Sequence, residues 1–196
     1  MDWQAVYDFV FPPQCGGCTA PGSGLCAECL PENSECSKRL RTLHVRGLAP
    51  YDGRVRNAIL ALKSGRRDVA RAFAQRLCRL IPPAATTVPI PTTKARRRER
   101  GFDGCLLIAR TICAGGAAEV CDGLVQVAGD AQRGRGRAAR LAAQGRFAWR
   151  TPALDGQRII LLDDVVTTGA TLEDCAAVVR AAGGKVEEAV VAAIAS

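Results

Sequence analysis

The segment Arg158-Ile-Ile-Leu-Leu-Asp-Asp-Val-Val-Thr-Thr-Gly-Ala-Thr171 decides the fold of this chain. Its first part, 158–162, is a continuous apolar run, which is typical of a parallel strand buried on both faces. A helix is expected over about 171–182, closed by Gly183-Gly184, and a second strand is expected over 185–194. Strand, loop, helix and strand in this order form a βαβ unit. The segment therefore favours an α/β fold with a parallel sheet.

Weaker patterns before residue 158 fit the same class. Asp103 is a suitable N-cap, and Thr171-x-x-Asp174 resembles a capping box at the start of the last helix. A polar connector is expected up to about Lys38. The remaining predicted elements are an extended segment over 43–49, short strands at 88–91 and 124–127, and helices over 3–11, 54–63, 68–80, 104–114 and 136–145.

Length, charge and residue counts exclude several classes of protein. The 196 residues suffice for one well-packed domain and a small appendage, which we predict as an N-terminal helix and zinc knuckle over 1–40 and an α/β domain over 41–196. No apolar run approaches the roughly 18 residues of a membrane span, and no basic signal-peptide segment opens the chain. We therefore expect a cytoplasmic protein without membrane insertion. The single histidine, His44, excludes a multi-histidine zinc active site, and no Walker-type loop or G-x-G-x-x-G motif is present.

Two adjacent carboxylates, Asp163 and Asp164, follow the apolar run, at the position where open α/β sheets bind their ligands. The start of the next helix offers backbone N–H groups and a positive dipole end, which together suit a phosphate. A sugar phosphate satisfies both halves, with its ribose hydroxyls on the aspartates and Mg²⁺ bridging neighbouring oxygens. The alternative is that the two acids only cap the helix, although adjacent carboxylates repel one another without structural gain. The predicted phosphate cradle consists of Val165, Val166, Thr167, Thr168, Gly169, Ala170 and Thr171.

Four cysteines near the N-terminus have the spacing of a metal site. Cys15, Cys18, Cys26 and Cys29 form two C-x2-C knuckles, which turn their thiolates toward one point and suit tetrahedral zinc. The segment is rich in Gly and Pro and poor in large apolar residues, so a structural Zn²⁺ would replace a hydrophobic core. The alternative is two disulfides, which would need an oxidising compartment. Cys36 has no C-x2-C mate and is predicted to be free or an alternate ligand.

The other cysteines lie in apolar-patterned segments and are predicted to be small buried side chains. They are Cys78, Cys105, Cys113, Cys121 and Cys175. Only Cys105, which follows a basic run, has a sequence neighbourhood that suits a reactive thiol.

The Asp-Asp–Thr-Thr-Gly-x-Thr segment resembles the phosphoribosyl-pyrophosphate (PRPP) signature of type I phosphoribosyltransferases. Three further stretches narrow the resemblance to the ComF (competence protein F) family, whose members carry an N-terminal zinc-finger segment. They are the cysteine knuckles, Tyr51-Asp-Gly-Arg-Val-Arg-Asn-Ala-Ile-Leu-Ala-Leu-Lys63, and Val88-Pro-Ile-Pro followed by Arg98-Glu-Arg-Gly-Phe-Asp103. The resemblance implies a type I phosphoribosyltransferase-like domain that binds PRPP or a related ribose phosphate with Mg²⁺.

The same resemblance assigns roles to individual residues. Asp163 and Asp164 would bind the ribose 2′ and 3′ hydroxyls, and 165–171 would bind the 5′-phosphate. The flexible loop after Pro91, with Lys94, Arg98 and Arg100, would approach pyrophosphate. Phosphoribosyl transfer would pass through an oxocarbenium-like ribose as pyrophosphate leaves, so that catalysis would consist mostly of positioning and charge stabilisation.

Two arginine-rich runs leave a second function open. Residues 94–100 contain five basic side chains in seven, and six arginines without a carboxylate lie at 133, 135, 137, 140, 146 and 150. They fit a loop that handles pyrophosphate, a track for nucleic-acid phosphates, or a solvated basic surface in a chain of net charge +8. Together with the resemblance to the ComF family, whose known members are tied to DNA uptake, the second interpretation implies a non-catalytic DNA-uptake (competence) factor that binds single-stranded DNA or a helicase partner.

Overall fold

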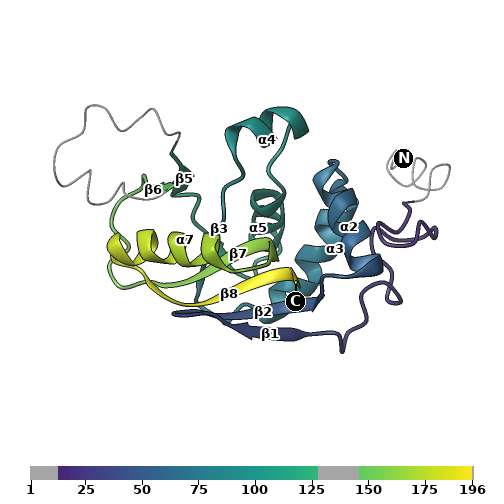
Figure 1. The fold of residues 1–196 in the computed structure, drawn as a ribbon, viewed down its shortest axis with the longest axis horizontal. Helices are drawn as coiled ribbons and strands as arrows, with labels where there is room; N and C mark the ends of the chain where they lie inside the picture. Colours follow the sequence, from purple (N-terminus) through teal and green to yellow (C-terminus); the bar gives the residue numbers. More distant parts are fainter. Residues whose placement is uncertain (1–12, 128–145, 196) are drawn as a thin grey trace.

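The computed structural model, which describes residues 13–127 and 146–195, is built around one six-stranded sheet (Figure 1). The strand order is β1-β2-β8-β7-β3-β4, and only the β1–β2 pair is antiparallel. This arrangement confirms the predicted α/β class with a mainly parallel sheet. The strands are β1 (Cys36–Arg39), β2 (His44–Pro50), β3 (Thr86–Pro89), β4 (Glu119–Val120), β7 (Arg158–Val166) and β8 (Lys185–Ile194).

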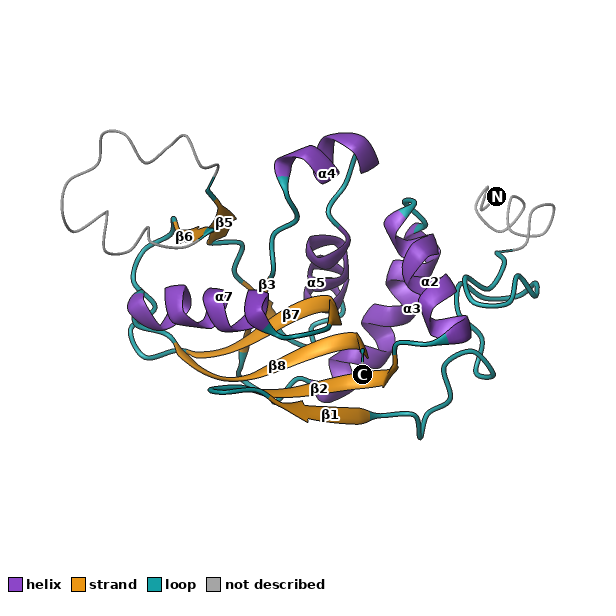
Figure 2. Cartoon of the chain, viewed as in Figure 1, coloured by secondary structure: helices purple, strands orange, loops and turns teal. Residues whose placement is uncertain are grey.

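Both faces of the sheet are covered (Figure 2). One face packs against α2 (Gly53–Lys63), α3 (Arg67–Leu77), the 3-10 turn η1 (Cys78–Leu80) and α5 (Gly104–Ala114). The other face packs against α7 (Ala170–Ala181) and the antiparallel hairpin β5 (Leu124–Gln126) and β6 (Phe147–Trp149). A further helix, α4 (Lys94–Arg100), projects from the sheet at the top of the view.

The continuous apolar run of β7 is explained by this double burial. Ile160 and Leu162 face the α2–α3–α5 side, whereas Ile159 and Leu161 face α7, and each is at most 1% exposed. Burying such a side chain contributes roughly 1.5–3 kcal/mol. The strand that carries the candidate site is therefore held by burial on both of its faces.

Several predicted elements coincide with observed ones. The predicted helix 104–114 is α5, and Asp103 caps it by accepting a hydrogen bond from Leu106 N–H at 3.2 Å. The predicted strand 185–194 is β8. The predicted helices over 3–11 and 136–145 lie outside the described residues.

Other predictions need correction. The expected connector before Lys38 contains β1, which pairs with β2, and the expected loop after Pro91 contains α4. The capping box at Thr171 is wrong, because α7 starts one residue earlier and its N-cap is Gly169, with no side-chain cap. The strand β7 does not end at residue 162, because its pairing with β8 continues to Val166.

The part of the chain that the structure describes contains no helix with the length and apolar character to cross a membrane.

Candidate functional site

A cavity of about 490 Å³ lies at the carboxyl ends of β7 and β3. This is the end of a parallel sheet where α/β proteins bind ligands, and the volume suits a small molecule. Segments from the whole chain meet in its wall. They contribute Tyr51, Lys63, Ile90, Pro91, Thr92, Thr93, Arg96, Arg100, Cys105, Gln126, Arg146, Phe147, Asp163, Asp164, Val165, Thr167 and Thr171.

The aspartate pair lines this cavity, and each carboxylate has its own partner. Asp164 Oδ2 lies 3.0 Å from Lys63 Nζ at the end of α2. Asp163 Oδ1 accepts a hydrogen bond from Asp164 N–H at 2.8 Å and a longer one from the Cys105 thiol at 3.5 Å. Burial, together with the neighbouring charge of Asp164, raises the pKa of Asp163 to about 7. Burial therefore disfavours the charged form of Asp163, and both side chains of the pair line the cavity.

The residues after the pair lead into α7. Thr167 and Thr171 line the cavity, whereas Val166 is buried and Thr168 is exposed away from it. The first helical hydrogen bond of α7 runs from Glu173 N–H to Gly169 O at 3.0 Å, so the amides of Thr171 and Leu172 precede the helical ladder. Of the predicted cradle, Val165, Thr167 and Thr171 thus line the cavity.

Gly169 has a different partner from the one expected. Its φ is +81°, and a Cβ there would lie 2.4 Å from Leu40 Cδ1, in the turn between β1 and β2. Lys38 in β1 also contacts this loop, since its Nζ donates a hydrogen bond to the Thr167 carbonyl at 2.7 Å. The absence of a side chain at Gly169 therefore allows Leu40 to pack closely against it. The β1–β2 hairpin contacts the loop through Leu40 and Lys38.

The basic segment is the helix α4, and only part of it faces the cavity. Thr93 caps the helix by accepting from Arg96 N–H at 3.1 Å. Arg96 and Arg100 line the cavity, whereas Arg98 is exposed outside it, and Lys94 is the first residue of the helix. Of the predicted pyrophosphate residues, the structure therefore brings Arg100 to the aspartate pair and leaves Arg98 away from it.

Several lining residues had no predicted role in the site, among them Tyr51, Lys63, Gln126 and Phe147, whereas Arg146 belongs to the second arginine-rich run. Tyr51 and Lys63 begin and end one of the stretches that carried the family resemblance, which is the one signal that could have found them. Burial and the nearby Asp163 charge raise the pKa of Cys105 well above its usual value. Cys105 is therefore a neutral thiol and not a reactive thiolate. Cys105 and Cys175 are buried, as predicted, whereas Cys113 is exposed, so the prediction is wrong for Cys113.

The four cysteines of the knuckles form the second candidate site. The sulfur atoms of Cys15, Cys18, Cys26 and Cys29 lie within 4.8 Å of one another, close enough to hold one metal ion. Cys18 Sγ and Cys26 Sγ are 3.7 Å apart, far beyond a disulfide bond of about 2.05 Å. No described disulfide is present, and the four residues fit a tetrahedral zinc site. Cys36 lies in β1, outside this group.

Backbone amides favour the charged form of one of these thiols. Gly17 N–H and Cys26 N–H point to Cys15 Sγ at 3.4 and 3.3 Å. Although burial alone would raise it, these backbone N–H groups lower the pKa of Cys15 to about 6. A thiolate is the form that binds zinc, so the local backbone prepares the site for a metal.

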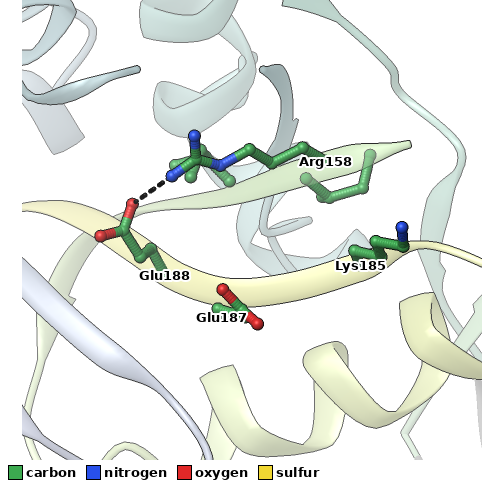
Figure 3. A pocket seen from close by; sticks show the side chains of 6 residues that line it. Arg158, Lys185, Glu187 and Glu188 are labelled. Atoms are coloured by element: carbon green, nitrogen blue, oxygen red, sulfur yellow. Dashed lines mark ion pairs between the residues drawn. The ribbon is translucent and has the colours of Figure 1, made fainter. Parts of the chain in front are cut away.

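A smaller hollow of about 150 Å³ lies at the opposite, amino ends of β7 and β8 (Figure 3). Two of its charged groups form an ion pair, since Arg158 Nη2 lies 3.6 Å from Glu188 Oε2. Open α/β sheets bind ligands at the other end, so this hollow is not the candidate site.

Comparisons with known proteins give one curated relative and several distant structures. No family model matches the chain. It is 34% identical over 85 residues to the competence protein ComFC of Bacillus subtilis (strain 168), and the match covers 43% of this chain and 34% of ComFC. Solved structures with partial similarity include the B. subtilis glutamine PRPP amidotransferase complexed with ADP and GMP (18% identity, TM-score 0.43, 66% of this chain and 26% of that one). Another is Leishmania donovani UMP synthase (16% identity, TM-score 0.43, 84% of this chain and 30% of that one).

The chain thus spans about one third of the length of the relative that it matches. The similarity to ComFC confirms the resemblance to the ComF family that the sequence motifs indicate.

Proposed function

We propose that this ComF-like protein binds PRPP or a related ribose phosphate in the 490 Å³ cavity, with Mg²⁺, and transfers its phosphoribosyl group with release of pyrophosphate. The observation that carries the proposal is the aspartate pair at the carboxyl end of β7, next to the N-terminus of α7. Hydroxyl-binding carboxylates and phosphate-binding amides are adjacent in the order that a ribose 5-phosphate requires.

The cavity wall gives each part of such a ligand a partner. Asp163 and Asp164 would accept hydrogen bonds from the ribose hydroxyls, and the 5′-phosphate would lie on the hydroxyls of Thr167 and Thr171 and the first amides of α7. A pyrophosphate on the other side of the ribose would meet Arg96 and Arg100 of α4. The cavity would thus place hydrogen-bond donors at the two anionic ends of the ligand and the carboxylate acceptors at the ribose between them.

The donor set fits Mg²⁺ as an ion that accompanies the ligand. The described residues contain no cluster of three or more metal-binding side chains besides the four cysteines, and Lys63 already pairs with Asp164. Mg²⁺ commonly binds through substrate phosphates and water with few protein ligands. In this site the pyrophosphate oxygens would be its main ligands, and the ion would supply neutralisation of the leaving group.

The protein's part in the transfer would be positioning and charge stabilisation. The bond between ribose C1 and the pyrophosphate oxygen would break, the electron pair would leave with pyrophosphate, and an acceptor nucleophile would form the new bond to C1. The carboxylates of Asp163 and Asp164 would hold the ribose ring while positive charge develops on it, and Arg96 and Arg100 would stabilise the departing anion.

Calorimetric titration with PRPP and Mg²⁺ tests this proposal. We expect wild type to bind and Asp164→Asn, which keeps the shape but removes the charge, to bind at least about tenfold more weakly, because a hydrogen bond to a charged group is lost. Glu187→Gln, an exposed substitution at the opposite end of the sheet, is the matched control and should bind as wild type does. Absence of heat with wild type, or equal heats for wild type and Asp164→Asn, would contradict the proposal.

A second function, binding of single-stranded DNA, is favoured by the outer side of α4. Arg97 and Arg98 are exposed, do not line the cavity, and form no ion pair with any described residue. Similarity to a competence protein adds a reason to test nucleic acid or a helicase partner. A gel-shift series in rising salt should show binding that falls steeply with salt. Arg97→Glu/Arg98→Glu should abolish it and Arg71→Glu on α3 should not; no shift at low salt would exclude the function.

We also propose that the four-cysteine cluster holds one structural Zn²⁺ and that the protein works in the cytoplasm, where a reducing environment keeps the thiols free. The division of the chain at residue 40 stays a prediction. The knuckle shares a core with α2 and α3, through Cys15, Leu25 and Leu30.

A further inference from the structure

Lys63 lines the cavity, although the sequence analysis assigned it no role there. It is the last residue of α2, and its Nζ lies 3.0 Å from Asp164 Oδ2. The two side chains are 28% and 20% exposed, so the pair is mostly removed from solvent but still lines the cavity. An ion pair at this depth has a stronger interaction than one on the surface, and loss of one partner leaves the other charge poorly compensated.

The chain contains only four lysines, at 38, 63, 94 and 185, and among those with described side chains only Lys63 lines the cavity. The ion pair of Lys63 with Asp164 gives the two aspartates different partners. Asp163 is held by backbone N–H and by the Cys105 thiol, whereas Asp164 is held by a side chain from another element. The position and charge of Asp164 therefore depend on α2 as well as on β7.

A bare pair of carboxylates would repel an anionic sugar phosphate, and many sites solve this problem with a metal ion. Here Lys63 supplies a positive charge beside Asp164. The compensation is built into the fold and is present before the ligand arrives.

We propose that Lys63 is a positioning residue for the ribose: it fixes Asp164 to accept the ribose hydroxyls and balances its charge, so that hydroxyl recognition depends on Lys63. This inference rests on the proposed ribose-phosphate function.

The test compares three probes by calorimetry: ribose 5-phosphate, 2-deoxyribose 5-phosphate and inorganic phosphate. The buffer is freed of Mg²⁺ on a chelating resin before the protein is added, so that metal at the cysteine cluster is retained. Wild type should prefer ribose 5-phosphate over its deoxy analogue by at least about tenfold, because one hydrogen bond to a charged acceptor is missing in the analogue. The affinity for inorganic phosphate gives a reference that involves no hydroxyl.

Lys63→Met should reduce the preference for ribose to within about threefold, because Asp164 is no longer held, while its affinity for inorganic phosphate stays as in wild type. Lys63→Arg should retain the preference, because it keeps the charge. Lys185→Met, at the amino end of β8, is the matched control and should behave as wild type does. If Lys63→Met does not fold, Lys63→Gln takes its place with the same expectation.

Two results would overturn the inference. One is a full ribose preference in folded Lys63→Met. The other is an equal loss of affinity for phosphate and for ribose 5-phosphate, which would make Lys63 a simple anion ligand. Failure of the proposed function has a different signature, since wild type would then bind neither ribose 5-phosphate nor PRPP with Mg²⁺.

Discussion

Substitution of Gly169 by alanine should destabilise the protein through the loop that precedes α7. The residue has φ +81°, and the left-handed region costs an L-residue roughly 1–2 kcal/mol. The new Cβ would lie 2.4, 2.5 and 3.0 Å from Leu40 Cδ1, Cδ2 and Cγ, so the whole end of that side chain must move. Pushing Leu40 off its rotamer adds about 0.5–1.5 kcal/mol. We therefore expect a loss of about 2–3 kcal/mol in the free energy of unfolding.

Denaturant unfolding followed by circular dichroism measures this loss, and a control isolates its two parts. Gly116 has φ +72°, and a Cβ added there would meet no atom within 4 Å, so Gly116→Ala carries the backbone strain alone and should cost about 1–2 kcal/mol. In a double-mutant cycle, Leu40→Ala combined with Gly169→Ala should recover about 1 kcal/mol relative to the sum of the single changes. Equal midpoints for Gly169→Ala and wild type, or no coupling to Leu40, would refute this account of the loop.

Three shorter predictions follow from the two sites. Metal analysis should find about one zinc per chain in wild type and none in Cys29→Ala, and a chelator should lower the unfolding temperature of wild type only. Because the pKa of Asp163 is raised from 3.8 to about 7, the unfolded chain loses between these values a proton that the folded protein keeps. The free energy of unfolding should therefore fall as pH rises through that window, and Asp163→Asn should flatten the dependence in pH-series denaturation; a stability that rises there would contradict the assignment. Arg96→Gln/Arg100→Gln should weaken PRPP binding by about tenfold or more and leave ribose 5-phosphate unchanged, with Arg97→Gln as the control outside the cavity; equal losses for both ligands would place these arginines elsewhere on the ligand.

The βαβ unit could be predicted because every signal in it agrees: an apolar run, a helix closed by glycines and a second apolar strand. The end of β7 could not be predicted, because Asp163 and Asp164 interrupt the apolar pattern while their backbone continues to pair with β8. Hydrogen bonding of the main chain, which leaves no mark on side-chain polarity, extends the strand to Val166.

Two other elements could not be predicted from hydrophobic patterning, because neither of them buries an apolar face. The strand β1 is a four-residue edge strand of alternating exposure, held through its pairing with β2. The helix α4 consists almost wholly of charged and exposed residues and depends on its Thr93 cap. Hydrophobic periodicity detects burial, and elements without burial are invisible to it.

The candidate site likewise contains residues that could be predicted from the sequence and residues that could not. The aspartates and threonines are contiguous in sequence, so their chemistry could be predicted from one segment. Lys63, Tyr51 and Cys105 reach the cavity only because α2 and α5 cover one face of the sheet at its carboxyl end. Nothing in their local sequence indicates which strand end they will meet.

The placement of charge around the cavity gives a way to separate the two proposed functions experimentally. Lys63, Asp164, Arg96 and Arg100 line the cavity, where a ligand must have anionic groups and hydroxyls at fixed separations. Arg97 and Arg98 lie outside it on the same helix, where any polyanion can reach them and hydroxyl spacing is irrelevant. Substitutions inside should change discrimination between ribose and deoxyribose phosphates, and substitutions outside should change only salt-dependent affinity. If substitutions inside and outside the cavity both altered DNA binding and neither altered sugar-phosphate binding, the cavity would be part of a nucleic-acid surface and not a sugar-phosphate site.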